Sequence, residues 1–452
     1  MSSRRSFLSR LAAVGAVLAA APGRLFGNGA ATARAADPVS FTGPGRTRYV
    51  GPDGMPRPPA GPLPPGFWRE LRAEFLIPDD EAFFNSGTLG SSPRAVLDAV
   101  VEHMTHVDRD IAHWDYKSGH ENYFTGYYPE TWVREKIAGL INADPAGVAL
   151  TQNATFGMNF LANGMDLGPG DEVVIMEGAH PGGRCGWELR EARYGANIRT
   201  IEPPIPPRDP DQLIRLFERA TTPRTRLWAI PHLTSATAIL FPVDELCRRA
   251  RERGIFTAVD GAQTFGHLAI DVQAMGCDAF YSSPHKWMLS PKGTGFLYVR
   301  EDAMARVWST LASSHWDNHD DPGFRLMQYG TGNLSLLVGL EKALDFHAAI
   351  GSGRVQERIT GLADRLREGL HDVPGVRIHS PEHPAMTSAT TIWSMDGIGA
   401  VELMDEMWNR SKVRVRSMGD PLGVRQCVHV YTLEEDVERA ISTAREISSR
   451  RS

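Results

Sequence analysis

The chain has 452 residues, of which 42% are hydrophobic and 23% are charged. These values exclude a wholly disordered chain, a collagen-like repeat and a coiled coil, and they allow two or three domains with a large core. The formal net charge of −6 argues against a nucleic-acid partner, because nucleic-acid phosphates favour a basic surface. The four cysteines show no C-x-x-C spacing, so we expect neither a disulfide framework nor a structural metal site.

Residues 1–36 have the features of a signal peptide that is removed on export. Ser3-Arg4-Arg5-Ser6-Phe7-Leu8 is a twin-arginine motif, the apolar run from Leu11 to Ala21 is too short to span a bilayer, and Ala33-Arg34-Ala35 offers a cleavage site. We therefore expect the twin-arginine export machinery as a partner, and a mature protein without a stable membrane span in the periplasm or outside the cell. The alternatives are a membrane-surface helix and a chance basic start.

A Pro- and Gly-rich stretch over 37–66 predicts an extended tether or surface arm, and folded patterning begins near Phe67. From there to residue 332, short apolar strands alternate with helices. Strands are expected at 148–151, 172–176, 226–231, 256–260, 279–282 and 295–299, and helices at 93–103, 131–141, 153–163 and 243–253. The alternation predicts an α/β domain with a mostly parallel sheet, whose ligands lie beyond the carboxyl ends of the strands.

The pattern changes after residue 332. Helices are expected at 334–350, 354–370, 400–409 and 433–447, with strands near Val376, Thr390 and Val413 and at 425–430. This predicts a smaller α+β domain over 333–452 that packs on the large one.

The strongest local motif is Ser282-Ser283-Pro284-His285-Lys286-Trp287, where a lysine follows a strand end. Asp260 ends another predicted strand 26 residues earlier. A lysine amine forms a Schiff base with the aldehyde of pyridoxal phosphate, and a carboxylate beside the pyridine nitrogen keeps the ring an electron sink. Most lysines lie in surface loops and an Asp-Gly pair is common in turns, but the two together predict pyridoxal phosphate chemistry.

Asp260-Gly261-Ala262-Gln263, Ser283-Pro284-His285-Lys286-Trp287 and Pro291-Lys292-Gly293-Thr294-Gly295 together resemble the class V aminotransferases, a family of fold-type I pyridoxal phosphate enzymes. The resemblance covers about residues 70–450 and is strongest to the isopenicillin N epimerase-like branch. It implies a large domain with a mostly parallel seven-stranded sheet, a smaller C-terminal domain and a Schiff base on Lys286.

The resemblance also implies the residues that bind the cofactor. Asn153, Ala154 and Thr155 open a helix whose N-terminus suits the cofactor phosphate, although the same residues would make a good helix cap in any protein. His180 matches a catalytic histidine that stacks on the ring, where the ordinary alternative is a structural histidine. The remaining matches are Gln263 and Ser235 near the phenolic oxygen and Ser283 and His285 near the phosphate.

Two further matches concern the partner subunit and the substrate. Gly330 and Thr331 resemble a turn that reaches the cofactor phosphate of the neighbouring subunit, which implies a homodimer. Arg425 matches the arginine that pairs with the substrate α-carboxylate, and Asn85 lies in a segment that lines the substrate pocket.

Two positions depart from the family pattern. Ser235 replaces the more usual asparagine. The stretch Arg416-Ser417-Met418-Gly419-Asp420-Pro421-Leu422 lacks the nucleophilic cysteine of cysteine desulfurases, and Cys427 has the sequence context of a packed residue. A persulfide-forming reaction is therefore disfavoured.

The same carbanion chemistry serves several reactions of an amino acid. With Lys286 as general base, the residues favour transamination or epimerisation, and the alternative is a β-elimination lyase or a desulfurase- or selenocysteine lyase-like enzyme. A binding module without turnover would not need both Lys286 and Arg425. An NAD-dependent oxidoreductase would need G-x-G-x-x-G, which the Asn153 region lacks.

Overall fold

The computed structural model describes residues 47–113 and 128–451. The predicted leader and the beginning of the Pro- and Gly-rich stretch lie outside the described residues. The largest sheet has seven strands in the order β2-β8-β7-β6-β5-β3-β4. The strands are β2 (Val148–Thr151), β3 (Glu172–Met176), β4 (Asn197–Ile201), β5 (Thr225–Pro231), β6 (Phe256–Asp260), β7 (Ala279–Ser282) and β8 (Gly295–Val299).

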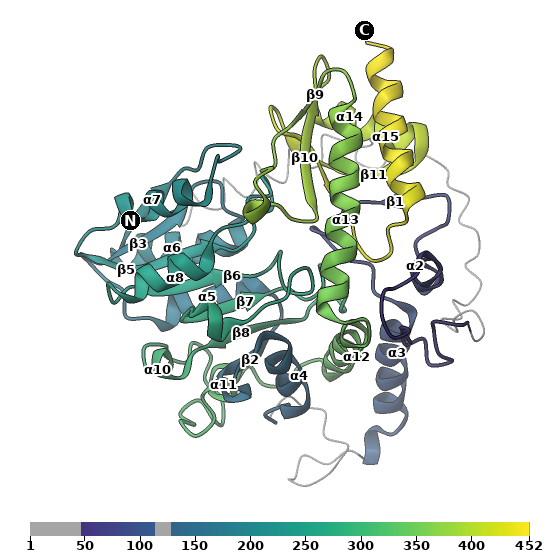
Figure 1. Cartoon of the computed structure of the whole chain (residues 1–452). Helices are drawn as coiled ribbons and strands as arrows, with labels where there is room; N and C mark the ends of the chain where they lie inside the picture. The colour runs from purple at the N-terminus through teal and green to yellow at the C-terminus, as the bar shows by residue number, and fades with distance from the viewer. Residues whose placement is uncertain (1–46, 114–127, 452) are drawn as a thin grey trace, which may run out of the picture. The chain divides into compact units, whose positions relative to one another are not determined.

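This sheet is parallel except at β8, which runs antiparallel to both of its neighbours. Its central strands are short apolar runs that are buried on both faces, as expected for strands covered by crossover helices. Helices α5 (Ala154–Gly164), α6 (Pro181–Tyr194) and α8 (Val243–Arg251) pack against it (Figure 1). The fold predicted for the large domain is confirmed.

Shorter helices complete this domain, and two longer ones pack side by side at its edge. The shorter ones are α4 (Thr131–Ile141), α7 (Pro210–Ala220), α9 (Val272–Met275), α10 (Glu301–Met304) and α11 (Pro322–Leu326). The longer ones are α3 (Arg94–Arg109) and α12 (Leu334–Ile350). Helix α3 runs six residues beyond the expected 93–103, because its last two turns are mostly polar and carry no clear apolar period.

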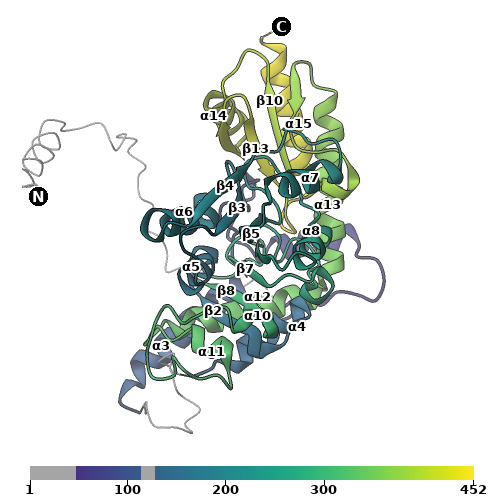
Figure 2. The same ribbon diagram turned by 90° about the vertical axis from the view of Figure 1, so that its left-hand side faces the viewer.

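The smaller domain contains a four-stranded antiparallel sheet in the order β12-β13-β10-β9. Its strands are β9 (Val376–Ile378), β10 (Thr390–Met395), β12 (Arg416–Gly419) and β13 (Gly423–Cys427). Helices α13 (Ser352–His371), α14 (Ala400–Ser411) and α15 (Glu434–Ser449) pack around this sheet (Figure 2). The α+β character expected for the C-terminal part is confirmed.

The N-terminal segment does not pack where the sequence pattern placed it. Helix α2 (Pro65–Arg72) buries Phe67 and Leu71 in the core of the smaller domain, not in that of the large one. Strand β1 (Ala82–Phe83) then pairs in parallel with β11 (Val413–Arg414), more than 300 residues later in the chain. A pairing over that sequence distance leaves no local pattern, which is why the domain boundaries predicted from the sequence missed it.

Within the Pro- and Gly-rich stretch, residues 47–66 do not form a free tether. Tyr49 and Val50 are buried, and the Tyr49 ring packs edge-on against Phe67 with centroids 5.7 Å apart. The backbone forms a single bridge between Val50 and Pro56. Among the residues that the structure describes, no helix is long and apolar enough to cross a membrane.

Candidate active site

A pocket lies at the carboxyl ends of β3, β5, β6 and β7, where an α/β sheet is expected to bind its ligand. Eight of the residues singled out by sequence line it together. They are Lys286, Asp260, His180, Ser235, Gln263 and Ser283, and Ala154 and Thr155 at the start of α5 complete the set. Residues separated by more than 130 positions therefore meet at one edge of the sheet.

Lys286 follows β7 in a turn and is largely enclosed. Burial lowers the pKa of its amine to about 8, an effect that Asp260 opposes and that the charges of Arg425 and Arg416 reinforce. An amine with this pKa is neutral in a substantial fraction of molecules near pH 8, and only the neutral amine is nucleophilic or basic.

Asp260 ends β6 and is held by the backbone, since its Oδ1 accepts a hydrogen bond from the Ala262 amide at 2.9 Å. Burial raises the pKa of this carboxyl group, while the Ala262 hydrogen bond and the Lys286 charge lower it. Gly183 faces the other oxygen, Oδ2, so closely that a Cβ at that position would overlap it. The glycine therefore keeps one face of the carboxylate open.

The start of α5 is a candidate anion site. Asn153 caps the helix by accepting a hydrogen bond from the Phe156 amide at 3.2 Å, and the Ala154 amide donates to Ser283 Oγ at 2.9 Å. The Thr155 side chain is exposed to the pocket, and a Cβ at Gly182 would come within 2.5 Å of its hydroxyl. Amides and a hydroxyl at a helix N-terminus are the groups that hold a phosphate.

His180 caps α6, because its Nδ1 accepts a hydrogen bond from the Gly182 amide at 3.0 Å. The proton of the neutral ring is therefore on Nε2. Desolvation and then the charges of Lys286, Arg416 and Arg425 lower the pKa of the ring, which favours the neutral form. A neutral ring fixed at the pocket wall suits the stacking role that the resemblance implies.

Gln263 is engaged on both sides of its amide group. Its Nε2 donates to the Gly87 carbonyl at 2.8 Å, and its Oε1 accepts from Trp287 Nε1 at 2.9 Å. These bonds join the residue after Lys286 to the N-terminal segment. Gln263 lines the pocket as expected, and in addition it holds the wall around the lysine in place.

Arg425 and Asn85 contact each other beside the pocket, where Arg425 also reaches the carbonyl of the pocket residue Ser235. The Arg425 side chain is 1% exposed, and its Nη2 donates to Asn85 Oδ1 at 3.0 Å and to Thr88 Oγ1 at 2.7 Å. Its Nη1 donates to the Ser235 carbonyl at 3.0 Å. The arginine thus contacts both the N-terminal segment and the loop after β5.

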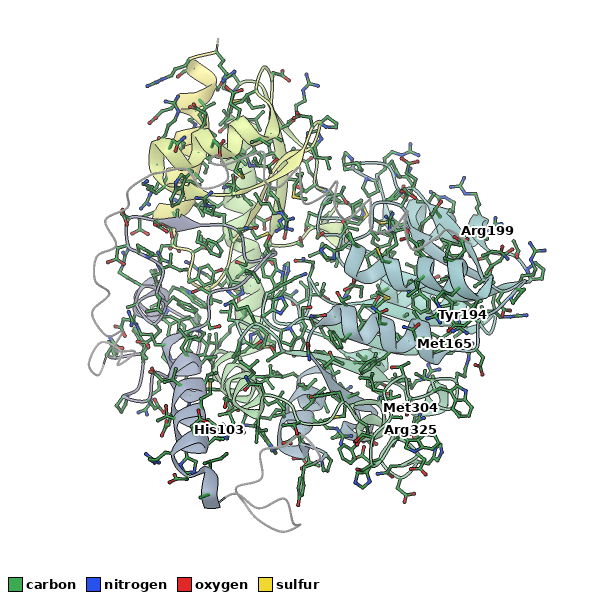
Figure 3. The ribbon with its side chains drawn as sticks, turned by 180° about the vertical axis from the view of Figure 1, so that it is seen from behind. His103, Met165, Tyr194, Arg199, Met304 and Arg325 are labelled. Carbon is green, nitrogen blue, oxygen red and sulfur yellow. The ribbon has the colours of Figure 1, made fainter. Side chains whose placement is uncertain are left out.

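Six predicted residues do not line the pocket. Of these, Asn153 caps α5, and Asn85 and Arg425 are hydrogen-bonded to each other beside the pocket. The other three are His285, Gly330 and Thr331. His285 does not line the pocket; burial lowers the pKa of its ring to about 4, and its carbonyl accepts the Gly90 amide at 2.9 Å. Gly330 and Thr331 precede α12 and also do not line the pocket of their own chain. They are followed by Ser335 at the start of α12, whose hydroxyl lies 2.9 Å from His103 Nδ1. Figure 3 labels His103 on α3.

Sequence reasoning missed four residues of the site: Thr88, Arg416, Gly182 and Gly183. The two glycines lie three residues or fewer after His180, and their closeness to Asp260 and Thr155 is visible only in three dimensions. Arg416 lies opposite Arg425 in the β12–β13 pair, a relation that the Gly-rich turn between them could have suggested.

The hairpin that joins β12 to β13 contains Asp420, Pro421 and Leu422 and no cysteine. Cys427 is fully buried in β13, where Thr390 Oγ1 lies 3.7 Å from its sulfur. It is a packed side chain, as the sequence context predicted.

Comparisons with known proteins agree with this geometry. The model of the family described as aminotransferase class-V matches residues 83–445. Isopenicillin N epimerase from Amycolatopsis lactamdurans is 31% identical over 402 residues, covering 84% of this chain and 98% of that protein. The epimerase from Streptomyces clavuligerus is 29% identical over 391 residues, covering 82% and 96%. The chain therefore belongs to the class V aminotransferase family.

A solved structure shares the fold. A variant of C-DES with glycine covalently linked to its PLP cofactor has a TM-score of 0.72 at 22% identity, covering 83% of this chain and 99% of that one. As a member of the class V aminotransferase family, this protein is a pyridoxal phosphate-dependent enzyme of amino acids. The pocket fits the cofactor: the α5 N-terminus offers a phosphate site, Asp260 a partner for the pyridine nitrogen and Lys286 an amine for the aldehyde.

Proposed function

We propose that the enzyme catalyses epimerisation at the α-carbon of an amino acid, with transamination as the second candidate. The observation that carries the proposal is the pairing of Lys286, whose pKa lies near 8, with Asp260 in one pocket, in a chain that matches two isopenicillin N epimerases over nearly their whole length. The family description, aminotransferase class-V, favours the second candidate.

Lys286, Asp260 and Arg425 have separate roles in the proposed reaction. When bound, pyridoxal phosphate supplies an electron sink that makes the α-proton of an attached amino acid acidic. Lys286, once its amine is free and neutral, removes that proton as general base. Asp260 holds a positive charge at the far end of the pocket, and Arg425 holds the α-carboxylate through its guanidinium. The buried Nε of Arg425 has no hydrogen-bond partner in the described residues, so donor capacity remains for that carboxylate.

The absence of a cysteine in the β12–β13 hairpin argues against the desulfurase alternative. Sulfur abstraction of the persulfide-forming kind needs a thiolate that can reach the substrate. Cys427 cannot serve, because it is buried within β13. Proton transfer at the α-carbon needs no further nucleophile.

The test is incubation of the cofactor-loaded protein in D2O with a panel of L-amino acids. Epimerisation predicts deuterium at the α-carbon together with the D-enantiomer on chiral chromatography, and no net formation of keto acid. Formation of keto acid in an amount equal to that of the enzyme would show transamination and would overturn the proposal of epimerisation. No exchange with any amino acid would refute both. Lys286→Ala should slow exchange by about 10²–10⁴-fold, whereas Lys342→Ala on α12 is the matched lysine control.

We also propose a homodimer in which Gly330 and Thr331 serve the pocket of the partner subunit. In support, this turn does not line the pocket of its own chain. The nearby helix α3 exposes Val101 and Met104, and Ile111 just after the helix is exposed as well. Lys286→Ala and Thr331→Glu proteins should each be inactive, yet regain activity when unfolded and refolded together, because one mixed site is then intact. Failure of the mixture to regain activity, with dimers shown by light scattering, would contradict shared sites.

Export by the twin-arginine route is a third proposal, supported by the motif at Arg4 and Arg5. Replacing both arginines by lysine should leave the precursor with its leader uncut inside the cell. Mass spectrometry of the N-terminus distinguishes the cut from the uncut chain. A wild-type protein recovered uncut from the cytoplasm would refute the proposal.

A further inference from the structure

Two arginines lie directly opposite each other in the smaller domain's sheet, and one of them, Arg425, donates to the carbonyl of the pocket residue Ser235. Arg416 on β12 pairs with Arg425 on β13 in the antiparallel register, so both side chains emerge from the same face of the sheet. Arg416 Nη1 donates to Thr88 Oγ1 at 2.8 Å, and Arg425 Nη2 donates to the same oxygen at 2.7 Å. One hydroxyl oxygen therefore joins two guanidinium groups.

Neither arginine forms an ion pair with an acidic side chain anywhere in residues 47–113 or 128–451. Their acceptors are all neutral: Thr88 Oγ1 for both, and Asn85 Oδ1 and the Ser235 carbonyl for Arg425. Like charges directly opposite in an antiparallel pair destabilise the sheet, and burial of an unpaired charge adds to that cost. Such an arrangement is favourable when an anion binds between or beside the two groups.

The charges of Arg416 and Arg425 affect ionisable groups inside the pocket. Burial and the charges of Arg425 and Arg416 lower the pKa of Lys286, and the same two arginines help to lower the pKa of His180. The two guanidinium groups differ in depth, however, since Arg425 is 1% exposed whereas Arg416 lies at the exposed edge of the sheet. They are therefore suited to two anionic groups at different depths.

We infer that the substrate carries a second carboxylate, which Arg416 binds while Arg425 binds the α-carboxylate. The inference rests on the proposed function for the identity of the ligand as an amino acid. A substrate with only one carboxylate would leave one of the two guanidinium groups without a counter-charge. In the competing arrangement, both arginines bind one and the same carboxylate.

The experiment compares matched ligands on the cofactor-loaded enzyme. Isothermal titration calorimetry measures the affinity of glutarate against butyrate, and spectral titration measures L-glutamate against L-glutamine and L-aspartate against L-asparagine. A charge-assisted hydrogen bond gives an expected preference of about tenfold or more for the dicarboxylic member of each pair. Binding of glutarate does not depend on turnover.

Variants assign that preference to Arg416. Arg416→Gln should lower the affinity for glutamate to that for glutamine, and Arg416→Glu should shift the preference toward L-lysine. Arg377→Gln is the matched control, because Arg377 is exposed on β9 of the same sheet and pairs with Asp396. It should leave the preference intact.

Equal affinities for the two members of each pair in the unmodified enzyme would overturn the inference. So would an Arg416→Gln variant that weakens glutamate and glutamine to the same extent, because Arg416 would then bind the α-carboxylate. Failure of the proposed function looks different. In that case no amino acid exchanges its α-proton, while the preference for glutarate over butyrate persists.

Discussion

The two sides of the pocket are built on different principles. On the large-domain side, opposite charges lie together: Asp260 ends β6, Lys286 follows the neighbouring β7, and Gly183 brings the backbone close to the carboxylate. On the smaller-domain side, two like charges, Arg416 and Arg425, face each other across neutral oxygens. On the cofactor side, the positive and negative side chains balance each other. On the substrate side, the two positive charges are balanced only when an anionic ligand binds.

The largest effect should come from removing the amine on the cofactor side. Lys286→Ala should lower the rate of α-proton exchange by about 10²–10⁴-fold, the range by which a positioned acid or base accelerates proton transfer. The visible absorbance of the lysine-bound cofactor should disappear as well. Exchange rates by mass spectrometry and an absorbance spectrum check this. An unchanged rate in this variant would mean that another group acts as the base. Lys286 would then not be the reactive charge of the cofactor side.

An intermediate effect should come from closing the open face of Asp260. Gly183→Ala places a methyl group on Oδ2, and overpacking of this kind costs about 1–3 kcal/mol. If the cost falls on cofactor binding, affinity for pyridoxal phosphate should drop roughly tenfold or more, as measured by fluorescence titration of the apoprotein. Gly168→Ala is the matched control, because no atom lies within 4 Å of its added Cβ. Equal cofactor affinity in the two variants would show that the glycine is not part of the cofactor side.

The cofactor side was also the more predictable of the two. Asp260 ends one apolar strand and Lys286 follows the next, and the local pattern predicts the bounds of both strands to within a residue. Parallel strands bring their carboxyl ends to one edge. Asn85 and Thr88 were harder, because their segment crosses to the smaller domain through the β1–β11 pair. Arg416 gave no signal as a single residue. Its role is inferred from its position opposite Arg425. That register depends on a bulge in the hairpin near Met418, and a simple alternation of apolar and polar residues does not predict a bulge.

The smallest effect concerns the contact between the two domains behind Lys286. Trp287 stacks on His267 with centroids 3.9 Å apart and packs against His429 on the other side at 5.5 Å. His429 Nε2 lies 3.0 Å from the Trp287 carbonyl, and the Ala389 amide donates to His267 Nε2 at 2.9 Å. Burial lowers the pKa of each ring to about 3, so both are neutral in the folded protein.

These two histidines should make the protein less stable in acid. Their pKa in the unfolded chain lies near 6.5, so below that pH the unfolded state binds protons that the folded state does not. Stability should therefore be fully present above about pH 6.5 and fall as the pH is lowered toward 3. Urea unfolding at a series of pH values measures the fall. His429→Gln should make it shallower, since one of the two protons is no longer taken up, while costing about 1–3 kcal/mol at pH 7 through the altered buried hydrogen bonds. His319→Gln, at an exposed position, should leave the slope unchanged; a slope equally steep in His429→Gln would show that the acid sensitivity arises outside this contact.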